Sequence, residues 1–165
     1  MLNFMSKFNK LCDILEKIIY WAVVMLFSML IITVFLQVIA RYLLDQPWLW
    51  TTDVSLLLLV WATFLGSAAA VRSNSHFLID LWPIHYVRTI FYLSLLSIAV
   101  VLFISSLYVY YGWEYALVSA KSRSGMTSIS MFYFLLSIPV GSLLMMVFSL
   151  EALGNQLINR PKERV

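Results

Sequence analysis

Four long apolar runs without a charged residue limit what this chain can form more than any other feature. They cover residues 18–40, 54–71, 89–113 and 124–150. About 20 apolar residues in an α-helix cross a membrane hydrocarbon core of about 30 Å. A chain exposed to lipid must also satisfy its own backbone hydrogen bonds, which a helix does. The sequence therefore predicts four transmembrane helices, with the fourth span placed at about 127–150.

The composition excludes the other broad classes. Hydrophobic residues make up 62% of the chain and charged residues 12%, which leaves too little polar surface for a soluble globule of 165 residues. The 16% of aromatic residues argues against disorder. The apolar runs are continuous, whereas the strands of a membrane β-barrel alternate. We expect an all-α integral membrane protein, with residues 1–165 forming a single membrane domain.

The segment before the first run, residues 1–17, has its own pattern. Its apolar side chains recur at helical spacing, and polar and charged side chains fill the other face. The apolar set is Phe4, Met5, Phe8, Leu11, Cys12 and Leu15. This pattern predicts an amphipathic helix that lies in the cytoplasmic interface before the chain turns into the membrane. The alternative is a solvated extension of the first span. In either case Cys12 is expected to serve packing.

The basic residues give the orientation, because cytoplasmic loops carry an excess of Lys and Arg. Of the 11 basic residues, those on the predicted inner side are Lys7, Lys10, Lys17, Arg72, Arg88, Arg160, Lys162 and Arg164. Those on the outer side are Arg41, Lys121 and Arg123. We therefore expect both termini in the cytoplasm, with residues 151–165 as a cytoplasmic tail. Residues 41–53 and 114–123 would form short loops outside.

The predicted spans contain no ionisable side chain, although ion and solute pathways usually place such groups at membrane depth. Gln37 is expected to make an interhelical hydrogen bond. His76 and His85 lie in the inner loop, away from any position that could ligate haem inside the bundle. We expect no enzyme, no catalytic, substrate-binding or metal residues, no cofactor and no nucleic-acid partner. A solitary transporter is also disfavoured.

The second span and its exit carry the most specific pattern. Ala62, Gly66 and Ala70 repeat every four residues, which would allow close approach of another helix. Trp61 lies in mid-span and is expected to pack against protein.

Beyond this stripe, Arg72, His76 and Asp80 continue the four-residue repeat. If the helix continues, they would form one polar ridge in which Asp80 pairs with His76. The plainer interpretation is a packing face followed by interfacial charges that reach phosphate head groups.

With these residues the chain resembles the DctQ-type small membrane subunit of tripartite ATP-independent periplasmic (TRAP) transporters, most closely those of sialic-acid systems. The residues that carry the resemblance are Trp50, Asp53, Trp61, Phe64-Leu65-Gly66, Ala68 to Ala70, Arg72, His76 and Ile79-Asp80. The family often has glutamate where this chain has Asp53, and the shorter acid changes the reach of the carboxylate. The four-span plan and the length agree with the family as well.

The resemblance implies a division of labour among three proteins. A periplasmic binding protein would capture an organic acid, such as a C4-dicarboxylate or a sialic acid. A large multi-span membrane subunit would move it by an elevator mechanism driven by sodium, which would bind in that subunit. The small subunit would be a scaffold in the bacterial inner membrane, packed beside the large one and in contact with lipids.

Two sets of residues are candidates for these contacts. The set for interface packing is Trp61, Ala62, Gly66, Ala70, Arg72, His76 and Asp80. The outer rim, which would help to dock the binding protein, is Asp45, Trp48, Trp50, Asp53, Glu114, Lys121 and Arg123. Alternatives from other classes are a membrane anchor for a redox complex and, less favoured, a small exporter that works as an oligomer.

Overall fold

The structure is a computed structural model that describes residues 2–46, 48–73 and 87–158. Its elements are α1 (Leu2–Tyr42), α2 (Trp50–Ser73), α4 (Val87–Val118), the short 3-10 helix η2 (Ser119–Lys121), α5 (Met131–Leu135) and α6 (Ser137–Ile158). No β-strand occurs within these described ranges. Four helices are long and apolar enough to cross a membrane. The predicted all-α class with four spanning helices is confirmed.

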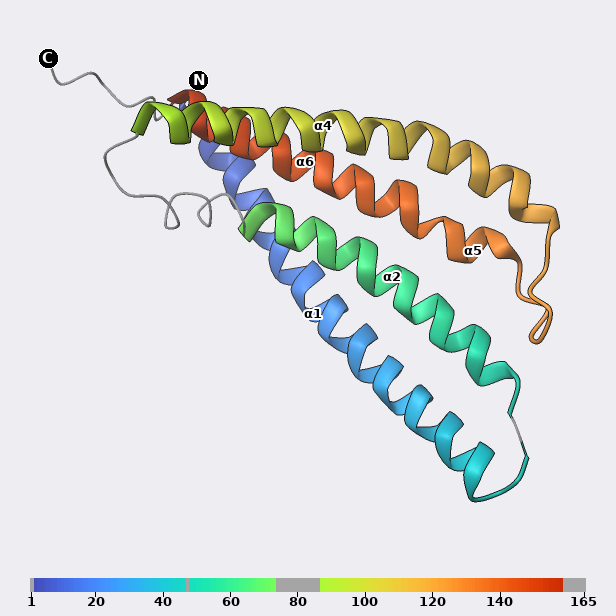
Figure 1. The fold of residues 1–165 in the computed structure, drawn as a ribbon. Helices are drawn as coiled ribbons and strands as arrows, with labels where there is room; N and C mark the ends of the chain where they lie inside the picture. Colours follow the sequence, from blue (N-terminus) through green and yellow to red (C-terminus); the bar gives the residue numbers. More distant parts are fainter. Residues whose placement is uncertain (1, 47, 74–86, 159–165) are drawn as a thin grey trace, which may run out of the picture.

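The long helices lie in a row in the order α1, α2, α6, α4 (Figure 1). Thus α2 packs on α1 and α6, and α6 packs on α2 and α4. The helices converge at the end where α1 begins and α6 ends, here called the terminal end. They splay apart toward the other end, here called the loop end, where α1 connects to α2 and α4 to α5. Helices α1 and α4 therefore form the two edges of the row.

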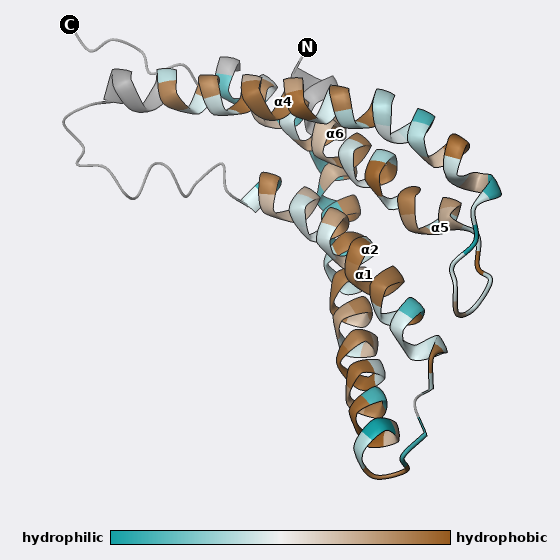
Figure 2. Ribbon diagram, turned by 45° about the vertical axis from the view of Figure 1, so that its right-hand side comes forward, coloured by the Kyte–Doolittle hydropathy of each residue, from teal (hydrophilic) through white to brown (hydrophobic). Residues whose placement is uncertain are grey.

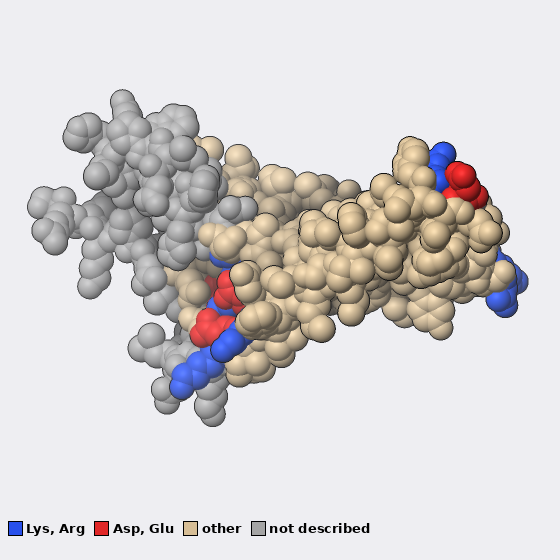
Figure 3. All heavy atoms as spheres, turned by 90° about the horizontal axis from the view of Figure 1, so that it is seen from below, with Lys and Arg blue, Asp and Glu red and all other residues tan. Residues whose placement is uncertain are grey.

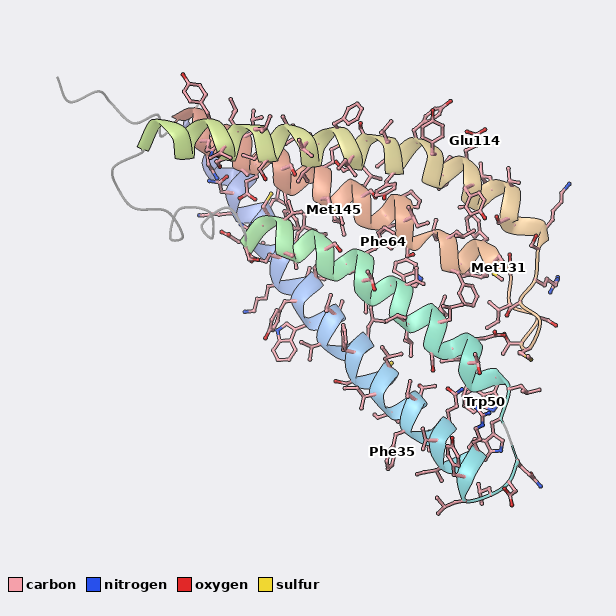
Figure 4. All side chains as sticks on the ribbon, viewed as in Figure 1. Phe35, Trp50, Phe64, Glu114, Met131 and Met145 are labelled. Atoms are coloured by element: carbon pink, nitrogen blue, oxygen red, sulfur yellow. The ribbon has the colours of Figure 1, made fainter. Side chains whose placement is uncertain are left out.

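Most large apolar side chains of the row face outward. Ile31 and Phe35 on α1 are 65% and 63% exposed, and Phe35 points away from the other helices (Figure 4). Figure 2 shows apolar residues along the whole length of the bundle. In water this exposure would be unfavourable, whereas lipid or a partner subunit would cover it.

Helix α1 differs from the prediction for residues 1–17. The sequence predicted a separate interfacial helix, but α1 runs without a break from Leu2 to Tyr42. No glycine or proline interrupts this stretch. Its apolar face is also used against protein: Cys12 and Ile19 form a buried cluster with Ala68 of α2 and Phe148 of α6. Cys12 is 1% exposed, which confirms its expected packing role.

The fourth span also differs in detail, because two helices share it. Pro139 has no backbone N–H to donate to the carbonyl of Leu135, so the helix is interrupted at Leu136 between α5 and α6. The Ser130 side chain caps α5 by accepting a hydrogen bond from the Phe132 amide (3.3 Å). Helix α6 then extends to Ile158, so the first part of the predicted tail is helical.

Candidate functional site

One arginine links three helices at the terminal end. Arg72, in the last turn of α2, donates from Nη2 to Asp13 (2.5 Å) and from Nε to Glu151 (3.1 Å). It also donates from Nη1 to the Cys12 carbonyl (2.7 Å) and to Glu16. The guanidinium lies over the ring of Phe148, 5.6 Å from its centroid. Arg72, Asp13, Glu16 and Glu151 are called the Arg72 cluster below.

The cluster joins three helices, because its acids come from α1 and α6 and its arginine from α2. Its members are unequally buried. The side chains of Arg72 and Glu151 are 14% and 6% exposed, whereas those of Asp13 and Glu16 are 66% and 42% exposed. Exposed ion pairs contribute little, whereas an unpaired buried charge is strongly destabilising. The pair Arg72–Glu151 is therefore the part of the cluster on which the helix packing depends.

A shallow cavity of about 280 Å³ adjoins the cluster. Its lining includes Glu16, Glu151 and Asn155, and Asn155 accepts a hydrogen bond from Asn9 of α1 (3.2 Å). On the face shown in Figure 3, charged side chains gather at the two ends of the molecule, with a wide uncharged surface between them. Within the described ranges, no three His, Cys, Asp or Glu side chains are grouped to hold a metal ion.

The geometry gives Arg72 contacts that the sequence did not predict. The sequence placed it at the head of a ridge with His76 and Asp80, reaching toward phosphate head groups. His76 and Asp80 lie outside the described residues. Among the described residues, Arg72 binds carboxylates of α1 and α6, which come from distant parts of the chain. It fastens helices of this chain to one another.

The small-residue stripe on α2 is only partly covered by this chain. Ala62 is buried, Ala70 is exposed, and a Cβ atom built on Gly66 would meet nothing within 4 Å. Trp61, next to the stripe, donates from its indole N–H to the Tyr133 carbonyl of α5 (3.0 Å), which is a contact within this chain. Gly66 and Ala70, the two stripe residues nearer the terminal end, are therefore less covered than Ala62.

Gln37 behaves as expected from the sequence. Its side-chain amide on α1 donates to the Thr52 hydroxyl of α2 (3.2 Å), so the predicted interhelical hydrogen bond is confirmed.

The structure places the seven residues of the predicted outer rim at or near the loop end. The exposed ones are Asp45, Trp48, Trp50, Glu114, Lys121 and Arg123. The rings of Trp48 and Trp50 stack with centroids 6.3 Å apart. Glu114 on α4 points away from α6 (Figure 4).

Asp53 does not belong with the exposed rim residues. It is 7% exposed, and its Oδ2 accepts hydrogen bonds from the backbone amide (2.8 Å) and the hydroxyl (2.7 Å) of Thr127. A buried carboxylate is stable when such donors replace its water. Asp53 therefore joins the start of α2 to the turn between η2 and α5, and offers no free surface charge.

Sequence reasoning missed Asp13, Glu16, Glu151 and Thr127. Asp13 and Glu16 carried one usable signal, since both acids lie on one face of a predicted helix near the membrane boundary. Glu151, just beyond the last apolar run, looked like an ordinary boundary charge. Thr127 carried no signal, because hydroxyl residues are common in such turns.

A family model described as "Tripartite ATP-independent periplasmic transporters, DctQ component" matches residues 29–159. The matched range includes Arg72, Glu151, Asp53 and Thr127, whereas Asp13 and Glu16 precede it. A search among curated proteins found no match.

Proposed function

This chain belongs to the DctQ component family of TRAP transporters, and from this membership we propose that it is the scaffold subunit of a sodium-coupled transporter for organic acids. The transported acid would be a sialic acid or a C4-dicarboxylate. The family match over residues 29–159 is the observation that carries the proposal. The chain would have no turnover of its own and no resident cofactor, and sodium would bind in the large subunit.

The arrangement of the helices supports a scaffold. The charged groups described above lie near the two ends of the long helices, and the apolar lengths between them offer no ionisable side chain that could carry a solute or a proton. The helices also expose many large apolar side chains, part of which a large membrane subunit could cover.

We assign the partners to different parts of the row. The large membrane subunit would pack on the apolar surface that includes Gly66 and Ala70, since small side chains allow close helix contact. The periplasmic binding protein would dock at the loop end. Both termini would then be cytoplasmic, in agreement with the distribution of basic residues. Membrane lipids would cover the remaining apolar surface.

Reconstitution tests this proposal directly. Proteoliposomes would contain the chain alone, the large subunit alone, or both, with the system's binding protein and labelled organic acid outside. We expect sodium-driven uptake only when both subunits and the binding protein are present. Uptake by this chain alone would contradict the scaffold role, and full uptake without the chain would show that the complex does not need it.

The redox-anchor alternative predicts a different observation. A haem anchor would copurify with a Soret absorption band and with a soluble oxidoreductase. The scaffold proposal predicts copurification with the large TRAP subunit and no such band.

A further inference from the structure

The turn between η2 and α5 is built largely by its own hydrogen bonds. Within residues 122–130, here called the outer turn, the Ser124 amide donates to the Ile129 carbonyl (2.8 Å). The Arg123 guanidinium donates to the Ser128 carbonyl (3.1 Å). Ser128 has a φ of 56°, a left-handed conformation that is uncommon for serine. The turn therefore has one defined shape.

Asp53 fixes this shaped turn to the rest of the molecule. Its buried carboxylate lies in the first turn of α2 and accepts two hydrogen bonds from Thr127. Hydrogen bonds to an ionised acceptor are stronger than those between neutral groups. The carboxylate also lies near the positive end of the α2 dipole, which stabilises its charge. The hydrogen bonds of Asp53 to the outer turn, those to Thr127 and one to the Ser124 side chain, thus fix the position of the turn relative to α2.

The outer turn presents positive charge outside the predicted spans. Lys121, immediately before it, and Arg123 within it are both exposed. Asp53 is buried and hydrogen-bonded, so it adds no surface charge beside them. The exposed acids at this end, Asp45 and Glu114, lie on other elements, the α1–α2 connection and α4. The partner that fits this surface is a protein with an acidic patch. Such charge complementarity mainly affects how fast the two proteins meet and in which position they dock.

We propose that Asp53 is a positioning residue for docking: by holding Thr127 it keeps Lys121 and Arg123 in a preformed basic surface that receives an acidic patch of the substrate-binding protein. This inference rests on the proposed function. Preorganisation lowers the entropy cost of binding, so loosening the turn weakens docking without touching the contact residues.

The test is a titration of binding protein against uptake in the reconstituted two-subunit complex. Asp53→Asn and Thr127→Val weaken the hydrogen bonding between positions 53 and 127. Thr127→Ser keeps both the backbone N–H and the hydroxyl donor and is the matched control. We expect Asp53→Asn and Thr127→Val to raise the half-saturating concentration of binding protein by about three- to tenfold. The maximal uptake rate should stay unchanged, and Thr127→Ser should resemble wild type.

A double-mutant comparison shows whether Asp53 acts through the basic surface. Lys121→Ala should weaken docking less in the Asp53→Asn background than in wild type, because the displaced turn no longer presents the lysine correctly. An unchanged half-saturating concentration in Asp53→Asn would overturn the inference. Loss of the two-subunit complex, or a lower maximal uptake rate with an unchanged half-saturating concentration, would also overturn it. Either result would indicate a purely structural role of Asp53. Absence of uptake in the wild-type complex would instead overturn the proposed function, and the inference with it.

Discussion

Gly141 of α6 lies against Phe64 of α2 more closely than any residue with a side chain could. A Cβ atom built on Gly141 would come within 2.6 Å of the Phe64 Cβ and within 3.0 Å of the Phe64 carbonyl oxygen. Figure 4 shows Phe64 on the side of α2 that faces α6. Because backbone atoms are part of this contact, a side-chain rotation cannot relieve it. The crossing of α2 and α6 therefore depends on glycine at this position.

We expect Gly141→Ala to destabilise the helix row by about 1–3 kcal/mol, since the added methyl group must push α2 and α6 apart. The measurement is thermal unfolding of the purified chain in detergent. Gly66→Ala is the matched control, because a Cβ there meets nothing within 4 Å. Equal melting temperatures for the two variants would show that the close contact is not present.

The Arg72–Glu151 pair gives a second prediction. Arg72→Leu leaves the buried Glu151 carboxylate without its partner and should cost about 3 kcal/mol of stability in the same assay. Replacing both with leucine should recover part of this loss, because two apolar groups leave no buried charge. The control is Asp13→Asn, which removes an exposed member of the Arg72 cluster and should cost less than about 1 kcal/mol. A loss in Asp13→Asn as large as in Arg72→Leu would contradict this ranking.

The orientation of the row is a third prediction. The structure places the α1–α2 connection and the outer turn at the same end, away from the start of α1 and the end of α6. The excess of basic residues on the other side predicts that this loop end is periplasmic. In a Cys12→Ala background, we expect Asp45→Cys or Ala120→Cys to react with an impermeant thiol reagent in intact spheroplasts. Reaction of Lys162→Cys under the same conditions would reverse the assigned orientation.

The sequence was sufficient to predict the spans, because each depends on local hydrophobicity and on the charges that end it. Pairing between helices was harder, and the two glycines show why. Gly66 sits in a regular stripe of small residues and Gly141 does not, yet of these two it is Gly141 that makes a close contact within this chain. Spacing shows that a helix face permits close approach, but it does not show which neighbour comes there.

The candidate site shows the same limit for polar residues. The repeat of Arg72, His76 and Asp80 suggested partners along one helix, since neighbours at four-residue spacing are the ones a sequence reveals. The partners found for Arg72 come from α1 and α6, and those of Asp53 from the outer turn. Such long-range contacts depend on how the helices converge, which no local pattern of residues encodes.

The open stripe on α2 gives the last prediction. A Cβ atom on Gly66 would meet nothing within 4 Å in this chain, so Gly66→Leu should leave the stability of the isolated chain nearly unchanged. If the large subunit packs on this surface as we propose, the leucine overfills the contact and should cost about 1–3 kcal/mol in the complex. Thermal stability would be measured for the chain alone and for the two-subunit complex, with Leu57→Ala, off the stripe, as the control. A complex as stable with Gly66→Leu as with wild type would show that this face meets lipid and that the large subunit binds elsewhere.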